Sequence, residues 1–184
     1  MTILPKGYTI THGYMDMQWM AYVDAHTPNQ LYYIHPWMGA KGWDGLKFDG
    51  GIVRAGVKFL AGSSGVGLKV TSVSLYFSEY GAPTGNVTVG VRKASDGTLV
   101  TIGTWNIQDF ETGNNKYRIF NPDNTYAMVA NDIVTVEFPA SAADGIELIT
   151  NLDATDPSGY ACQKYAGTWT NATNPFAMII CGKM

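Results

Sequence analysis

The sequence is poor in charge, in arginine and in long apolar runs, and each shortage excludes a class of protein. Only 15% of the 184 residues are charged, and the net charge is −3. A nucleic-acid-binding surface needs clustered Lys and Arg, whereas the arginines, Arg54, Arg92 and Arg118, are scattered. No apolar run approaches the roughly 20 residues of a membrane-spanning helix. We therefore expect neither a nucleic-acid nor a membrane partner.

The residue constellations that carry enzymatic catalysis are also missing. Glycoside hydrolysis needs two carboxylates opposed across one bond, and the glutamates lie on different segments without an identifiable pairing. They are Glu79, Glu111, Glu137 and Glu147. No Gly-x-Ser-x-Gly nucleophile elbow occurs. We predict a non-enzymatic protein without catalytic residues.

The candidate metal ligands form no recognisable site. The histidines, His12, His26 and His35, lack the spacing of zinc ligands and are distant from the cysteines. Two loops, residues 121–124 and 153–156, carry Asp and Asn side chains of the kind that calcium prefers. Asx turns account for these side chains without a metal. We predict no cofactor and no bound metal.

Glycine and short alternating apolar segments are abundant instead. Residues 72–93, SVSLYFSEYGAPTGNVTVGVRK, alternate apolar and polar residues on both sides of GAPTG, which predicts a strand, a turn and a strand in one hairpin. Similar signals recur to the end of the chain. Hairpins are predicted for 87–93 with LVTIGTWNI, for TYAMVA with IVTVEF, and for YACQKY with FAMIICG. About eight to ten strands predict an all-β, antiparallel two-sheet β-sandwich, jelly-roll-like, over residues 51–184.

An aromatic-rich segment, residues 1–50, precedes this pattern and has weak periodicity. Aromatic residues are enriched in interface cores, which predicts an N-terminal arm or extension that packs on a neighbouring subunit. Its predicted interface residues are Tyr14, Trp19, Tyr22, Tyr32, Tyr33, Trp37 and Trp43. Two other interpretations stay open: the aromatics cap one end of the sandwich, or they form a platform for a ligand. Residues 15–25 fit a short helix and a strand equally well.

Two pairs of residues near the C-terminus are further candidates. If YACQKY and FAMIICG pair, Cys162 and Cys181 fall opposite each other and a disulfide is geometrically feasible. A free cysteine is also a good small core residue, so both alternatives stand. Trp169 and Tyr165 are candidates for stacking on a sugar ring, because sugar sites in sandwiches use aromatic side chains. A tryptophan at this place can equally close the core.

From about Gly51 to the end, the order of features resembles a β-sandwich module of secreted surface proteins and of virion structural proteins of bacterial and archaeal viruses. The features that match are residues 72–93, the segment YAMVANDIVTVEF, and a final GTW followed by FAMIICG. The resemblance implies a jelly-roll-like fold. It transfers no catalytic residue.

The start of the chain, MTILPKGYTITHG, lacks the apolar segment of a signal peptide, so we expect a cytosolic origin. Joined to the resemblance, this predicts a non-enzymatic virion structural protein, a head decoration or tail-associated protein assembled in the host cytoplasm. Its partners would be further copies of itself and other virion proteins. The alternative is an extracellular carbohydrate-binding or adhesion module at a cell surface, with a surface glycan as partner.

Overall fold

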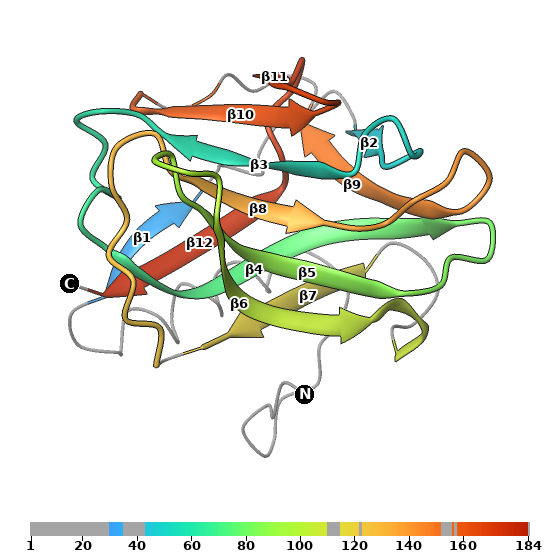
Figure 1. Cartoon of the computed structure of the whole chain (residues 1–184), viewed down its shortest axis with the longest axis horizontal. Helices are drawn as coiled ribbons and strands as arrows, with labels where there is room; N and C mark the ends of the chain where they lie inside the picture. Colours follow the sequence, from blue (N-terminus) through green and yellow to red (C-terminus); the bar gives the residue numbers. More distant parts are fainter. Residues whose placement is uncertain are drawn as a thin grey trace.

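A computed structural model of the chain describes residues 30–34, 43–109, 115–121, 123–151, 156 and 158–183 (Figure 1). The strands are β1 (Gln30–Ile34), β2 (Trp43–Lys47), β3 (Arg54–Phe59), β4 (Lys69–Tyr80), β5 (Asn86–Arg92), β6 (Leu99–Asn106), β7 (Asn115–Phe120), β8 (Ile133–Glu137), β9 (Gly145–Asn151), β10 (Tyr160–Tyr165), β11 (Trp169–Asn171) and β12 (Met178–Lys183). One 3-10 turn, η1 (Ile107–Asp109), follows β6. Of the predicted interface residues, Tyr14, Trp19, Tyr22 and Trp37 lie outside the described residues, as do residues 15–25.

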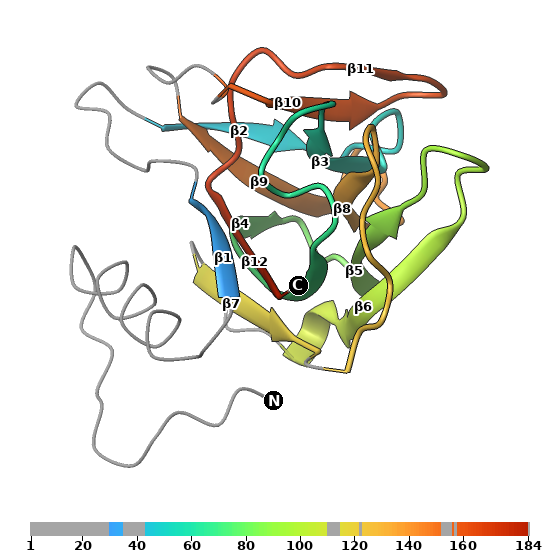
Figure 2. The ribbon, with the colours of Figure 1, turned by 90° about the vertical axis from the view of Figure 1, so that its left-hand side faces the viewer.

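The strands form two antiparallel sheets packed face to face. The first sheet has the order β1-β12-β4-β9-β2, with β7 also paired to β4, and the second has the order β11-β10-β3-β8-β5-β6. Figure 2 shows β1, β12 and β7 on one side and β5 and β6 on the other. Consecutive strands repeatedly change sheet, as in Greek-key and jelly-roll sandwiches. The predicted all-β, two-sheet sandwich is confirmed.

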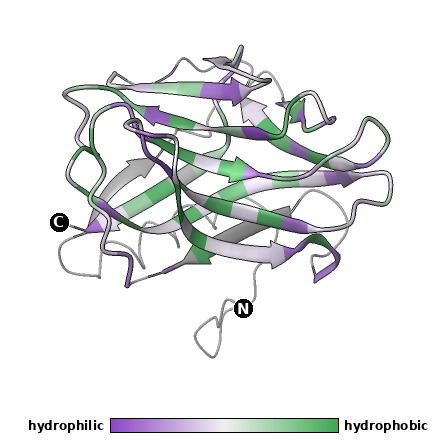
Figure 3. Cartoon of the chain, viewed as in Figure 1, coloured by the Kyte–Doolittle hydropathy of each residue, from purple (hydrophilic) through white to green (hydrophobic). Residues whose placement is uncertain are grey.

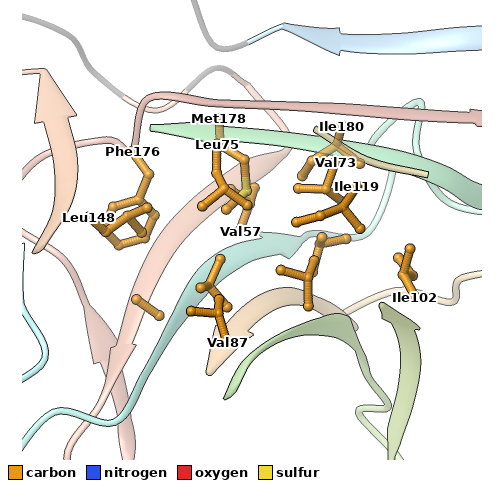
Figure 4. Close-up of a cluster of buried hydrophobic side chains, with 14 of the residues drawn as sticks. Val57, Val73, Leu75, Val87, Ile102, Ile119, Leu148, Phe176, Met178 and Ile180 are labelled. Carbon is orange, nitrogen blue, oxygen red and sulfur yellow. The ribbon is translucent and has the colours of Figure 1, made fainter. Parts of the chain in front are cut away.

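The core lies between the two sheets because every second residue of each strand faces inward. In the first sheet, Ile180, Val73 and Ile119 occupy one cross-strand row, and Figure 4 shows them lying together. Val57 and Val87 of the second sheet point toward them and are no more than 1% exposed. The alternation is visible in Figure 3 as hydrophobic and hydrophilic bands along the strands.

Residues 72–93 contain the two predicted strands, but they do not form a hairpin. β4 pairs only with first-sheet strands and β5 only with second-sheet strands, so the connection crosses from one sheet to the other. Gly81 and Gly85 have positive φ values of 69° and 111°, and the Ala82 N–H donates to Asp144 Oδ1 at 2.7 Å. The prediction of two apolar faces folded onto one core is confirmed, and the prediction that they pair is wrong.

The second predicted hairpin is correct and the third is wrong. β5 pairs with β6 across a turn in which Gly97 has φ 72°. By contrast, β8 pairs with β3 and β5, and TYAMVA makes only one isolated bridge, between Ala127 and Lys69. Backbone hydrogen bonds from Met128 N–H to Leu68 O and from Gly67 N–H to Met128 O hold this segment as a loop. Met128 is 1% exposed and plugs the end of the core.

The sandwich includes part of the segment that was predicted to be an arm. β1 pairs with β12 and β2 pairs with β9, so both are strands of the first sheet. Phe48 is fully buried in the core, and its N–H donates to Ile146 O at 2.8 Å. A boundary at residue 50 therefore cuts through sheet and core, and the described sandwich begins before residue 51.

The predicted pairing of the last two segments is also wrong. β10 pairs with β3 and β11, whereas β12 pairs with β4 and β1. Cys162 and Cys181 are thus in different sheets, and no disulfide joins them. Cys162 faces the core, where its Sγ accepts the Phe176 N–H at 3.4 Å. The register that made a disulfide feasible does not exist in the structure.

Candidate functional site

A single row of side chains crosses all six strands on the outer face of the second sheet. Residues directly opposite each other in an antiparallel pair share a face of the sheet. From β11 to β6, the row consists of Trp169, Tyr165, Arg54, Glu137, Thr88 and Thr104. Neighbouring strand positions such as Ala55, Val136 and Val89 belong to the core, so this row faces away from it.

The aromatic end of the row comes from a tight hairpin. The Ala166 N–H bonds Thr168 O at 3.2 Å and Gly167 has φ 81°, which turns β10 directly into β11. The rings of Tyr165 and Trp169 meet edge to face, with centroids 5.3 Å apart and an interplanar angle of 62°. Both side chains are half-buried.

The position of Trp169 decides between two sequence interpretations. Trp169 and Tyr165 are neither members of the core cluster nor packed against it, whereas Trp105 of β6 is packed against it. Trp169 therefore does not close the core. The structure brings the two predicted stacking residues together on an outer face.

Arg54 connects the aromatic end of the row to its charged centre. Its guanidinium lies over the Tyr165 ring, 4.7 Å from the centroid, which is cation–π geometry. Its Nε is 3.2 Å from Glu137 Oε2, and the side chains of Arg54 and Glu137 are 30% and 15% exposed. The ring and the carboxylate together fix the orientation of the guanidinium.

Glu137 is shared between two arginines. Arg92 donates to it in a bidentate pair, from Nε to Oε1 at 2.6 Å and from Nη2 to Oε2 at 2.8 Å. The remaining amino group of Arg92, Nη1, donates to Gly97 O at 2.5 Å. Such charge-assisted bidentate bonds are short and geometrically specific. Arg92 is therefore fully engaged within the protein, and it fixes Glu137 beside Arg54.

A second cross-strand row runs parallel to the first and consists, at its β10–β11 end, of Asn171, Gln163 and Gly56. Gln163 Nε2 donates to Asn171 Oδ1 at 3.1 Å at the β10–β11 end. Next to Gln163, Gly56 brings the backbones of β3 and β8 close together, because a Cβ at Gly56 would lie 2.1 Å from Val134 O. The floor beside the aromatic end is thus backbone flanked by amide side chains.

The predicted interface residues that the structure describes are Tyr32, Tyr33 and Trp43. In register, Tyr32 lies opposite Cys181 and Tyr33 opposite Ile180, at consecutive positions of β1. Trp43 lies opposite Asn151 in β2, at the other end of the first sheet. The predicted interface stays a prediction.

In both loops considered for calcium, Asp or Asn side chains bond to the protein backbone, and Asp153 lies outside the described residues. Asn121 Oδ1 accepts the Asp123 N–H at 3.1 Å, and Asn124 bonds the Tyr126 N–H and Val70 O. In the second loop, Asp156 Oδ2 accepts the Cys162 N–H at 2.8 Å. Over the described residues, no three His, Cys, Asp or Glu side chains gather as metal ligands.

The sequence missed Arg54, Glu137, Gln163 and Asn171 as members of a site. Glu137 lies on the outer face of its strand, because the alternating positions Val134 and Val136 belong to the core. The partners lie on strands far apart in the chain, so only the strand order brings them together.

No family model, no curated protein and no solved structure matches this chain. Within the described part of the chain, no helix is long and apolar enough to span a membrane.

Proposed function

We propose that this protein is a non-enzymatic saccharide-binding protein whose binding surface is the outer face of the second sheet at its β10–β11 end. The observation that carries the proposal is the position of Trp169 and Tyr165, which are partly exposed and not packed against the core. Of the two functions that the sequence suggested, this geometry favours carbohydrate binding.

The chemistry of the surface fits a sugar ring. A pyranose presents apolar C–H faces and a rim of hydroxyl groups, so it binds where an aromatic ring lies beside hydrogen-bonding side chains. Trp169 and Tyr165 supply the aromatic rings. Asn171 is exposed and lies on the same face as the Arg54 guanidinium, so the two supply an amide and a guanidinium for the hydroxyl groups, while the buried Gln163 donates to Asn171 Oδ1 and holds that amide in place.

A glycan array, followed by calorimetry on the glycans that bind, tests the proposal. The Trp169→Ala and Tyr165→Ala variants should each weaken binding by about tenfold or more, the loss of one stacking contact. Because neither residue is in the core, both variants should keep the thermal unfolding midpoint of the wild type within a few degrees.

Thr170→Ala is the matched control. Thr170 is exposed, lies on β11 between Trp169 and Asn171, and is opposite Lys164 in register, which places it on the other face of the strand. This variant should bind like the wild type. Wild-type binding by the Trp169→Ala variant would contradict the proposal, as would the absence of binding to every glycan on the array.

A second candidate function is the virion structural role that the sequence predicts. One observation favours it: β1 ends the first sheet and pairs only with β12 among the described strands, so its other edge can accept a strand from a neighbouring subunit. Both functions can belong to one protein, because a virion protein can carry a saccharide-binding face.

Light scattering coupled to size-exclusion chromatography tests this role. The wild type should form oligomers, and a Tyr32→Lys/Ile34→Lys double variant should reduce them, because charge on an edge strand disfavours edge-to-edge pairing. A wild type that stays monomeric at every concentration would contradict assembly through this edge.

A further inference from the structure

We infer that the saccharide bound by this face is acidic, and that Arg54 binds its oxyanion, a carboxylate or a sulfate group. This inference rests on the proposed saccharide-binding function and names the ligand class for the same surface.

Arg54 has donors that the protein does not use. Its Nε is engaged with Glu137, and its central carbon lies 4.7 Å from the centroid of the Tyr165 ring. Among the residues that the structure describes, no acceptor bonds the two terminal amino groups of Arg54, although 30% of the side chain is exposed. A guanidinium with both terminal groups available matches the two oxygens of a carboxylate or a sulfate in a bidentate pair.

Arg92 shows by contrast what a purely structural arginine looks like on this face. All three of its nitrogens donate, two to Glu137 and one to Gly97 O, and its side chain is 18% exposed. Arg54 is the more exposed of the two arginines and the one beside the aromatic pair.

The charge of the face favours an anion. Its outward strand positions carry the cations Arg54, Lys58 and Arg92 and the single carboxylate Glu137, a sum of +3 − 1 = +2. The whole chain has a net charge of −3. The positive charge of this face therefore attracts anionic ligands, although the protein as a whole is acidic.

The stacking contact at the aromatic pair and the oxyanion contact at Arg54 lie side by side. Tyr165 lies between Trp169 and Arg54 in the cross-strand row and contacts both. Adjacent strands are about 4.8 Å apart, so the three residues span roughly the width of one sugar ring with its substituent. A ring stacked at the aromatic pair can therefore extend an oxyanion to the terminal amino groups of Arg54.

The experiment uses an array of glycan pairs that differ in one acidic group or one acidic residue: glucuronate and glucose oligosaccharides, sulfated and unsulfated galactosides, and sialylated and desialylated N-acetyllactosamine. The wild type should bind acidic members at least about tenfold more tightly than their neutral partners. Added salt should weaken that binding. The carboxylate and sulfate pairs show which oxyanion is preferred.

Two variants distinguish a direct contact of Arg54 with the ligand from the effect of the positive charge of the whole face. Arg54→Gln should remove the preference for acidic glycans. Lys58→Gln loses the same charge on the same strand and face, four positions away, and should change affinity by less than about threefold. Equal losses in the two variants would overturn the assignment to Arg54.

The remaining outcomes separate this inference from the proposed function. Equal binding of acidic and neutral partners, lost in Trp169→Ala, would overturn the acidic ligand and leave saccharide binding intact. No binding to any glycan would overturn the proposed function, and the acidic ligand with it.

Discussion

The hydroxyl of Tyr126 donates a 2.8 Å hydrogen bond to Oδ2 of Asp132, a residue that is fully buried. Two backbone groups donate to the same carboxylate, Val129 N–H to Oδ2 and Ala94 N–H to Oδ1, each at 2.8 Å. The carboxylate therefore ties the loop after β5 to the loop before β8. Asn131, with φ 74°, forms the turn that presents it.

Replacing Asp132 should be among the most destabilising changes in the described chain. Asp132→Ala leaves three donors without their acceptor, so we expect the free energy of unfolding to fall by at least about 2 kcal/mol. Urea denaturation measures this loss. Asp123→Ala, which changes an exposed aspartate, should cost less than about 0.5 kcal/mol. Equal effects of the two substitutions would show that the buried carboxylate contributes nothing special.

The hydrogen bond between Tyr126 and Asp132 makes the stability of the fold depend on pH in the alkaline range. Burial, the hydrogen bond to Asp132 and the charges of Asp132 and Asp96 raise the pKa of Tyr126 from 10.0 to about 12. A raised phenol pKa means that the folded protein keeps a proton which the unfolded chain has lost. Its contribution is fully present below pH 10.0 and is lost as pH rises toward about 12.

Denaturation midpoints measured across this alkaline range check the effect. The wild type should lose more stability between pH 10 and about 12 than the Tyr126→Phe variant, which has no proton to release there. Other tyrosines contribute equally to both proteins. Parallel curves for the two proteins would contradict a raised pKa at Tyr126.

Glu79 should destabilise the folded protein when it is ionised. It lies opposite the core residue Ile146, so it faces inward at the end of β4, and its Oε1 is buried with no hydrogen-bond partner among the described residues. Burial raises its pKa above the usual 4.5. The protonated form is thus favoured in the fold, and stability falls as pH rises through the folded pKa.

The Glu79→Gln variant removes this ionisation and keeps the shape of the side chain. It should be more stable than the wild type near neutral pH, with a difference that shrinks below pH 4.5. Denaturant titrations at several pH values measure the difference. Glu147→Gln, on the other face of the first sheet, is the matched control. A Glu79→Gln difference that is independent of pH would contradict the prediction.

Alternation predicted which side of each strand faces the core but not which strands are neighbours. Val73 and Leu75 and, across the turn, Val89 and Val91 are all buried as the pattern indicates. The same pattern is satisfied by a hairpin and by a connection between sheets, because both bury the same faces. The strand predicted for TYAMVA is wrong for a different reason. Met128 is apolar because it fills the end of the core from a loop, not because it belongs to a strand.

The aromatic half of the candidate site could be predicted and the charged half could not. Trp169 and Tyr165 are close in sequence and belong to the residue type that stacks on sugars. Arg54 and Glu137 are 83 positions apart, 137 − 54, and each looks like an ordinary solvated charge in its own strand. Their contact follows from the pairing of β3 with β8, a long-range choice that local sequence does not encode.

The thiol of Cys162 should be inert in the native protein. Its side chain is 1% exposed in the core, and burial, with the nearby charge of Asp156, raises its pKa far above the ordinary value for a thiol. The thiolate is the nucleophile, so a buried thiol held neutral reacts slowly with alkylating reagents. Iodoacetamide should therefore modify Cys162 only after unfolding, as peptide mass spectrometry of native and denatured samples would show.

The same experiment addresses the cross-link that the sequence left open. Cys162 and Cys181 lie in different sheets, so the intact mass should be identical with and without reductant. A mass two hydrogens lower before reduction would show a disulfide and would require β10 and β12 to lie closer than the sheet order places them.

Cys162→Ala, which removes a buried sulfur and its contact with the Phe176 N–H, should lower the free energy of unfolding by about 1 to 2 kcal/mol while leaving glycan binding unchanged.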